Sequence, residues 1–203
     1  MWHRFLMSAA RRYLHREVHR QPPRPLADFD AAGVQRVLLL NFTALGDLLF
    51  STPAIRALAE TYPHWRLDLL VNPAFAPLME AHPRLRRLWL YPGRGPGFLK
   101  LMRRLRREAY DLAVILHGND PEATLLAWAS GAPFIIGSAH SPLAFVYSAG
   151  VARRDPLEHA IERRLNYVRL LGADTAARHM ELFLPPEAEA QGEEVLTRHF
   201  GTP

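Results

Sequence analysis

The chain has 203 residues, of which 49% are hydrophobic, and this is enough to bury one full domain core. It contains no cysteine, so a disulfide framework and a zinc site built from thiolates are both excluded. No apolar run reaches the roughly 18 residues of a membrane span, and the N-terminal segment lacks the continuous apolar centre of a signal peptide.

The net charge of +5 is unevenly distributed. Residues 1–24 hold six arginines and one glutamate, so they account for the whole excess, and the rest of the chain is balanced. Within that balanced part, residues 84–107 hold nine basic residues and no acidic one. Because the basic charge is focused in two segments, it favours particular anionic contacts over general polyanion binding.

Residues 1–24 are predicted to form a basic amphipathic N-terminal segment. Over residues 1–20 one helical stripe carries Trp2, Phe5, Leu6, Ala9 and Tyr13, and Arg4, Arg11 and Arg12 lie off it. This pattern is typical of a helix that lies on an anionic membrane surface. The alternative is that the helix packs on its own domain, as most amphipathic helices do. The prolines of residues 21–25 end the helix and mark a linker.

From residue 35 onward, short apolar runs alternate with helical patterns. The strand candidates are residues 36–41, 67–71, 86–91, 112–116 and 133–136. The intervening helices are expected at residues 52–62, 74–81, 97–109 and 121–130. This alternation predicts an α/β fold, a Rossmann-like parallel sheet flanked by helices, over residues 35–185. Residues 138–156 are expected to be an irregular aromatic flap over the site.

Two later helices complete the pattern. Residues 157–171 form a strong helical pattern that Gly172 ends, and a last helix is expected at about residues 187–199. The basic helix at residues 97–109 is interpreted as a solvated face, because charge runs usually are. Nucleic-acid binding through the arginine clusters is disfavoured, since they lack the interleaved aromatic side chains that stack on bases.

The candidate site lies at the ends of two strand patterns. Residues 36–40 run through a glycine-containing turn into a helix, which places free N–H groups and the Asp47 carboxylate at the carboxyl edge of the sheet. Asp47 is the candidate catalytic residue, although helix capping would also explain it. The candidate substrate-binding residues are Thr43, Gly46, His117, Gly118 and Asn119. A structural role remains the alternative for His117, and a turn for Asn119.

Three blocks of the sequence resemble the heptosyltransferase-like glycosyltransferases (glycosyltransferase family 9). The first block is Asn41-Phe42-Thr43-Ala44-Leu45-Gly46-Asp47 with Ser51-Thr52-Pro53. The second runs from Tyr110-Asp111-Leu112 through Leu116-His117-Gly118-Asn119 to Ser130-Gly131-Ala132. The third is His159 with Glu162-Arg163 and Leu170-Leu171-Gly172. They follow one another in the order and spacing that the family shows, over roughly residues 35–185.

The resemblance implies the N-terminal, acceptor-binding domain of a GT-B type enzyme. Such an enzyme inverts the anomeric centre while it transfers a sugar from a nucleotide sugar such as ADP-heptose to a lipopolysaccharide-core-like acceptor. It needs no cofactor and no bound metal, and Asp47 matches the family's catalytic aspartate. Glycolipid or glycan acceptors are the implied partners, at the cytoplasmic face of the inner membrane, where peripheral attachment is expected.

The resemblance is incomplete in two ways. Family members often carry arginine where this chain has Asn41, and no stretch resembles the family's nucleotide-sugar motif. Residues 186–203 are therefore expected to be a linker into a second domain that the chain lacks, and the chain alone is expected to be inactive. A non-catalytic module that binds a glycan or a partner is the alternative hypothesis.

Overall fold

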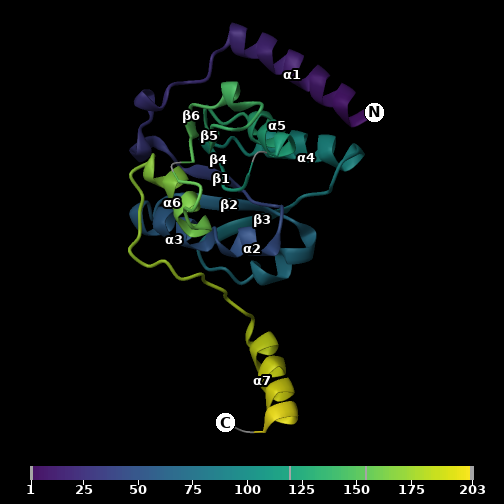
Figure 1. Ribbon diagram of the computed structural model, residues 1–203, viewed down its shortest axis with the longest axis vertical. Helices are drawn as coiled ribbons and strands as arrows, with labels where there is room; N and C mark the ends of the chain where they lie inside the picture. The colour runs from purple at the N-terminus through teal and green to yellow at the C-terminus, as the bar shows by residue number, and fades with distance from the viewer. Residues whose placement is uncertain (1, 119, 154, 202–203) are drawn as a thin grey trace.

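The computed structural model describes residues 2–118, 120–153 and 155–201, with side chains from residue 8 onward (Figure 1). Six strands form one parallel sheet in the order β3-β2-β1-β4-β5-β6. Their bounds are β1 Arg36–Leu40, β2 Arg66–Val71, β3 Leu85–Leu90, β4 Leu112–Ile115, β5 Phe134–Ser138 and β6 Ala149–Val151. The predicted Rossmann-like parallel sheet is confirmed.

Helices cover both faces of this sheet, with α1, α4 and α5 on one side and α2, α3 and α6 on the other (Figure 1). Their bounds are α1 Trp2–Arg20, α2 Leu45–Leu49, α3 Thr52–Thr61, α4 Pro96–Arg107, α5 Pro121–Ser130, α6 Ala160–Arg169 and α7 Pro186–Phe200. Short 3₁₀ helices lie at Leu26–Asp28, Ala31–Gly33, Pro73–Leu78 and Ala144–Val146. Helix α7 stands away from the sheet at the end of an extended segment.

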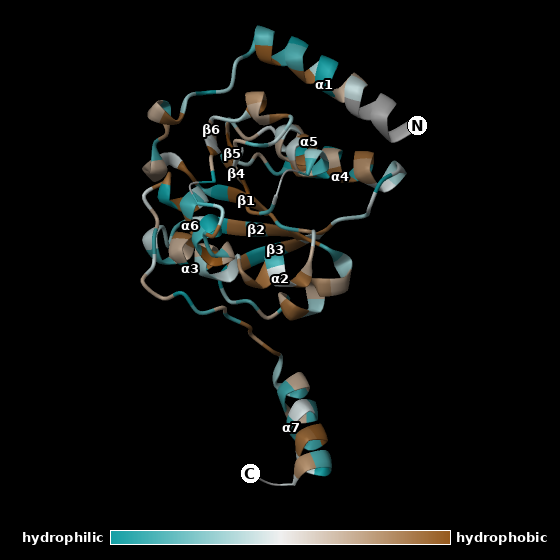
Figure 2. Ribbon diagram, viewed as in Figure 1, coloured by the Kyte–Doolittle hydropathy of each residue, from teal (hydrophilic) through white to brown (hydrophobic). Residues whose placement is uncertain are grey.

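The central strand β1 shows why the sheet is buried on both faces. Val37 and Leu39 point into the cluster shared with α2, α3 and α6, whereas Leu38 and Leu40 point into the cluster shared with α4 and α5. All four side chains are fully buried. Successive side chains of a strand face opposite sides, so a parallel strand between two helical layers is apolar throughout. In Figure 2 the central strands are brown, the colour of hydrophobic residues.

The structure differs from expectation at residues 74–81, where an α-helix was predicted. A 3₁₀ helix at Pro73–Leu78 occupies this place instead. Pro77 lies inside it and has no N–H to donate, so a regular α-helix cannot continue through this position.

The segment at residues 138–156, expected to be an irregular flap over the site, is more regular than predicted, although Ser138, His140 and residues 151–153 line the cavity beside the site. The segment contains the 3₁₀ helix Ala144–Val146 and the edge strand β6, which pairs with β5. Its aromatic residues serve packing: Tyr147 is buried in the core cluster, and Phe145 stacks on His15 of α1 with ring centroids 3.9 Å apart. At Gly137 a Cβ would come within 2.6 Å of the Tyr147 ring, so the missing side chain lets that ring lie flat against β5.

No helix within the described residues is both long enough and apolar enough to cross a bilayer.

Candidate active site at the carboxyl ends of β1 and β4

The chain order reverses between β1 and β4. From β1 the sheet grows outward through β2 and β3, and then the chain returns to the other side of β1 to form β4. In open α/β sheets this switch point opens a crevice at the carboxyl ends of the strands, where ligands bind. Thr43 and Asp47 follow β1 and His117 follows β4, so all three lie at this end of the sheet.

Asp47 lies in the first turn of α2, and its side chain is 39% exposed. One carboxylate oxygen, Oδ1, accepts a hydrogen bond of 2.6 Å from Nη2 of Arg164, which comes from α6. The other, Oδ2, has a single long contact of 3.3 Å with the Thr43 hydroxyl. One oxygen is therefore fixed by the protein, and the other remains available to accept a proton from a ligand.

Asn41 fixes the turn that carries Asp47. Its side chain is fully buried, and Nδ2 donates to the backbone carbonyl of Asp47 at 2.8 Å and to the Ser51 hydroxyl at 2.7 Å. The Ser51 hydroxyl in turn donates to the same Asp47 carbonyl at 3.0 Å. These bonds close the loop between β1 and α3, so Asn41 holds the backbone of the candidate catalytic residue rather than facing a ligand.

His117 is fully buried behind the site. Its Nδ1 lies 2.9 Å from the carbonyl oxygen of Leu40, and because a carbonyl only accepts, Nδ1 carries the proton and donates it. Nε2 is then an unprotonated acceptor, without a partner among the described residues. Burial lowers the pKa of His117 to about 4, and the nearby positive charge of Arg164 acts in the same direction. His117 is therefore a neutral residue that supports the site from inside.

The remaining predicted residues lie around the same edge. Thr43 and Gly118 are exposed, while Asn119 lies outside the described residues. Gly46 is exposed inside α2 and is not among the glycines with positive φ, so a left-handed backbone does not explain it. A Cβ there would only reach ordinary contact, 3.8 Å, with the ring of Phe50. A ligand can therefore come close to the backbone near Asp47. Neither the backbone conformation nor steric crowding requires glycine at residue 46.

A cavity of about 220 Å³ adjoins this edge beside Gly118. Its basic lining residues are His140, Arg153, Arg163 and Arg164, and Glu158 also lines it. The Nε atoms of Arg163 and Arg164 are buried and have no hydrogen-bond partner among the described residues. Glu158 is partly engaged, since its Oε1 accepts from Asn166 at 2.7 Å. The excess of guanidinium groups suits a negatively charged group of a ligand.

Among the described residues, no group of three or more histidine, aspartate or glutamate side chains is arranged to hold a metal ion.

No family model matches the sequence. Lipopolysaccharide heptosyltransferase 3 of Escherichia coli is 24% identical over 150 residues, which cover 70% of this chain and 44% of that protein. The protein of the same name from Escherichia coli strain K12 is 31% identical over 78 residues, 35% of this chain and 23% of that protein. In sequence, this chain is similar to heptosyltransferases. It spans less than half of the length of these two relatives.

Solved structures show the same fold as this chain. The glycosyl transferase family 9 structure from Veillonella parvula DSM 2008 has a TM-score of 0.70 at 23% identity, over 86% of this chain and 52% of that one. Escherichia coli ADP-heptose LPS heptosyltransferase II has a TM-score of 0.63 at 18% identity, over 80% of this chain and 51% of that one. Both likenesses extend over about half of the solved protein.

Arg164 is the residue of the candidate site that sequence reasoning missed. Ile161, Leu165 and Val168 form the buried face of α6, and Arg164 lies on the same face. A charged side chain in the middle of an apolar helical face signals a buried partner, because an unpaired buried charge is strongly unfavourable. The family resemblance pointed to the neighbouring pair Glu162-Arg163 instead. The Glu162 carboxylate, however, pairs with Arg169 of the same helix and with Arg178 of the C-terminal segment.

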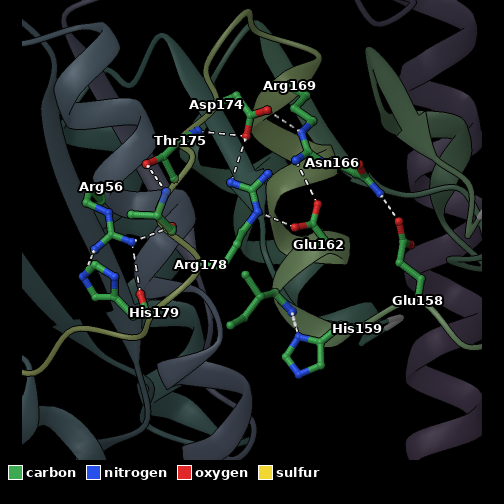
Figure 3. A network of polar contacts seen from close by, with 12 residues as sticks. Arg56, Glu158, His159, Glu162, Asn166, Arg169, Asp174, Thr175, Arg178 and His179 are labelled. Atoms are coloured by element: carbon green, nitrogen blue, oxygen red, sulfur yellow. Dashed lines mark hydrogen bonds and ion pairs between the residues drawn. The ribbon is translucent and has the colours of Figure 1, made fainter.

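Figure 3 shows the polar network on the other side of α6. Glu162 forms ion pairs with Arg169 and Arg178, and Arg169 also binds Asp174 at 3.0 Å. His159 begins the helix: its Nδ1 accepts from the backbone N–H of Ile161 at 3.3 Å, and its ring lies edge-on to Phe50 at 5.6 Å. These contacts join α6 to the segment that follows it and to Phe50 after α2. The packing of α6 on α3 is apolar, since both helices contribute to one buried cluster.

Proposed function

We propose that this chain supplies the acceptor-binding half of an inverting glycosyltransferase. The donor is a nucleotide sugar such as ADP-heptose, and the acceptor is a lipopolysaccharide-core-like glycan at the cytoplasmic face of the inner membrane, to which the protein attaches peripherally. The observation that carries this proposal is the half-exposed Asp47 carboxylate at the switch point of the sheet, with one oxygen held by Arg164 and the other available. The names of the relatives support the choice of donor and acceptor.

In the proposed reaction Asp47 is the general base. Its Oδ2 accepts the proton of an acceptor hydroxyl while that oxygen forms a bond to the anomeric carbon of the donor sugar. The bond from that carbon to the diphosphate oxygen breaks on the opposite face, and its electron pair leaves with the nucleoside diphosphate. Arg164 holds Oδ1 and so directs Oδ2 toward the acceptor. His117 is excluded as the base because it is fully buried.

Two further parts complete the proposal. The cavity lined by Arg163 and Arg164 takes a negatively charged group of the acceptor and places its hydroxyl beside Asp47. The groups that stabilise the departing diphosphate belong to a second domain. The chain alone is therefore proposed to be inactive, and it needs this second half for turnover.

The test is sugar transfer by the chain joined to its presumed second half, with the variant Asp47→Asn. Base catalysis is worth about 10²–10⁴ in rate, so kcat is expected to fall by about that factor. The introduced amide keeps an oxygen that accepts from Arg164, which limits the effect on folding. Glu60→Gln is the matched control, because it also removes an exposed carboxylate that pairs with an arginine. Glu60 lies in the last turn of α3, away from the candidate site. Near-normal kcat in a folded Asp47→Asn enzyme would refute the role.

The second candidate function is a non-catalytic module that binds a glycan or a partner. The observation that favours it is the ion pair itself, which engages Asp47 with a side chain of the protein. If the protein is such a module, the wild type and the Asp47→Asn variant should bind acceptor glycans with equal affinity. Neither should transfer sugar when joined to a donor-binding half. A transfer signal that depends on Asp47 would exclude it.

A further inference from the structure

Helix α1 packs against the layer of helices that covers one face of the sheet, and it does not extend into solvent. Leu14 is buried in the same cluster as Leu101 and Leu105 of α4, and the ring of His15 stacks on Phe145. Figure 1 shows α1 along the side of the molecule that α4 and α5 cover. The basic helix α1 and the basic helix α4, which are far apart along the chain, therefore belong to one side of the folded protein.

The basic side chains on this side are exposed and unneutralised. Among the described residues they make no ion pair with an acidic side chain; they are Arg11, Arg12, Arg16, Arg24, Lys100, Arg103, Arg106 and Arg107. Arginines elsewhere differ: Arg86 and Arg169, for example, each bind two carboxylates. Charge that the protein does not pair internally remains available to an external anion.

A groove of about 650 Å³ separates the two helices. Tyr13 lines it from α1, Met102 and Arg106 from α4, and Trp128 from α5, with Arg24 and Glu17 also in its wall. Residues 13, 16 and 20 share one face of α1, and residues 99, 103 and 106 share one face of α4, by helical spacing. Because Tyr13 and Arg106 line the groove, arginines from both helices border it.

Exposed apolar side chains accompany this charge. Tyr13 is 58% exposed and Leu99 is 56% exposed, each on the helix face that carries arginines toward the groove. Basic side chains with apolar ones beside them, on helices that lie on the surface, are the pattern of proteins that bind an anionic lipid interface. A nucleic-acid surface would favour several aromatic side chains in a row for stacking, which this face lacks.

We propose that α1 and α4 together form a docking face for an anionic lipid bilayer. The arginines of both helices bind lipid phosphates, Tyr13 and Leu99 enter the headgroup region, and the groove between the helices receives headgroups. This deepens the membrane attachment proposed above and replaces the expectation that residues 1–20 alone provide it. The assignment of α4 as a merely solvated face would then be wrong. The test does not depend on sugar transfer, so a failed transfer assay would leave this proposal standing.

The experiment is co-sedimentation of the full chain with vesicles of phosphatidylcholine alone or mixed with phosphatidylglycerol. Wild type should bind only the mixed vesicles, and added salt should weaken binding. Arg103→Glu/Arg107→Glu on α4 should weaken partitioning by at least about thirtyfold, which corresponds to about 1 kcal/mol per arginine. Arg12→Glu/Arg16→Glu on α1 should do the same. Within the part of the chain that the structure describes, these four arginines form no ion pair with an acidic side chain, so melting temperatures should not change.

The matched control is Arg66→Glu/Arg198→Glu, which reverses two exposed arginines outside this face, at the start of β2 and on α7. It should bind as wild type within about a factor of two. Loss of binding in the α1 variant alone would refute the joint face, as would equal loss in the control. Full displacement by inorganic phosphate, or binding to single-stranded DNA but not to mixed vesicles, would also overturn the proposal.

Discussion

Arg164 donates a hydrogen bond of 2.6 Å to Asp47 across 117 residues of sequence. The guanidinium is almost wholly buried, with 7% of its side chain exposed, whereas the carboxylate is 39% exposed. Burial lowers the pKa of Arg164, and the charge of Asp47 opposes that shift. The buried Arg164 therefore needs the Asp47 carboxylate to balance its charge. The Asp47 carboxylate, in contrast, is still exposed to solvent and can contact a substrate.

A double-mutant cycle tests this dependence. Asp47→Ala should destabilise the fold by roughly 1–3 kcal/mol, because it leaves a buried guanidinium without its acceptor. Arg164→Met should cost less, since Met fills the space and Asp47 regains water. The double variant should then be more stable than the sum of the two effects predicts, with a coupling of about 1 kcal/mol or more. Denaturant unfolding of the four proteins measures it.

The pair Glu194–Arg198 on α7 is the control for that cycle. Both side chains are 67% exposed, and their contact of 2.5 Å is as short as that of the site pair. Exposed pairs at this helical spacing couple by only about 0.3–0.5 kcal/mol. If the Asp47–Arg164 coupling is no larger than this value, Arg164 does not depend on Asp47.

Arg56 is expected to hold the C-terminal segment on α3. It is buried, it donates to the backbone carbonyls of Ala177 at 2.8 Å and His179 at 3.0 Å, and it pairs with Glu181 at 2.5 Å (Figure 3). Arg56→Met removes these bonds, so residues 175–184 should open locally more often. Limited chymotrypsin digestion should cleave near Phe183 about tenfold faster, the factor expected for about 1.4 kcal/mol of local stability.

Arg84→Met is the comparison for this segment, because Arg84 also pairs with Glu181 but is more exposed and binds no backbone carbonyl there. It should accelerate cleavage much less than Arg56→Met. Equal acceleration by both variants would show that the Glu181 ion pairs, and not the carbonyl bonds, retain the segment.

The sheet was predictable from the sequence, because each strand is marked by a short apolar run of neighbouring residues. Five apolar runs separated by helical patterns match five of the six parallel strands, and Asp47 and His117 lie at the same end of the sheet as expected. Strand β6 has three residues, Ala149, Gly150 and Val151, which is too short for any periodicity. It forms because Gly150 allows close approach: a Cβ there would lie 3.0 Å from the Cα of Ala139.

The partners of the site residues were not predictable, because they depend on tertiary packing. Arg164 reaches Asp47 only after α6 has packed on the sheet, and Asn41 turned out to hold the Asp47 backbone. The strand pattern at residues 67–71 likewise gave no reason to expect a buried carboxylate at Asp68. That carboxylate is tolerated because Arg86 binds it; Arg86 is the extra residue of β3 at the register shift beside Asp68, whose strand partner is Arg87.

Asp68 should be among the most sensitive positions for stability. It is fully buried and accepts from Arg86 Nε at 2.8 Å, from Arg86 Nη2 at 2.5 Å and from the Tyr110 hydroxyl at 2.6 Å. Asp68→Ala removes one of the two carboxylates that Arg86 binds and leaves the buried Tyr110 hydroxyl without its acceptor. Leaving a buried donor unsatisfied costs about 1–3 kcal/mol. Tyr110→Phe removes one donor to Asp68 and also the hydroxyl that accepts from Trp89 Nε1 at 2.7 Å, and it should cost about 1–2 kcal/mol. Urea unfolding measures both, and a loss below about 1 kcal/mol for Asp68→Ala would contradict the expectation.

Acid should destabilise the protein through His117. Burial lowers its pKa to about 4 in the folded state, against the ordinary value of 6.5. Between these two pH values the unfolded chain binds a proton that the folded protein cannot accept. The free energy of unfolding therefore falls as pH falls from 6.5, and the loss is complete near pH 4. For a fully buried group the shift corresponds to at most about 3 kcal/mol.

His117→Asn isolates this contribution. The Asn amide can donate to the Leu40 carbonyl as Nδ1 does, but it does not titrate. Denaturant unfolding at a series of pH values should show a smaller loss between pH 6.5 and 4 in the variant than in wild type. His64→Asn, at an exposed position, serves as the control and should leave the loss unchanged. His82, which burial also shifts to a pKa of about 4, accounts for part of the loss that remains in His117→Asn. An identical pH dependence in wild type and His117→Asn would mean that His117 gains a proton when folded as readily as when unfolded.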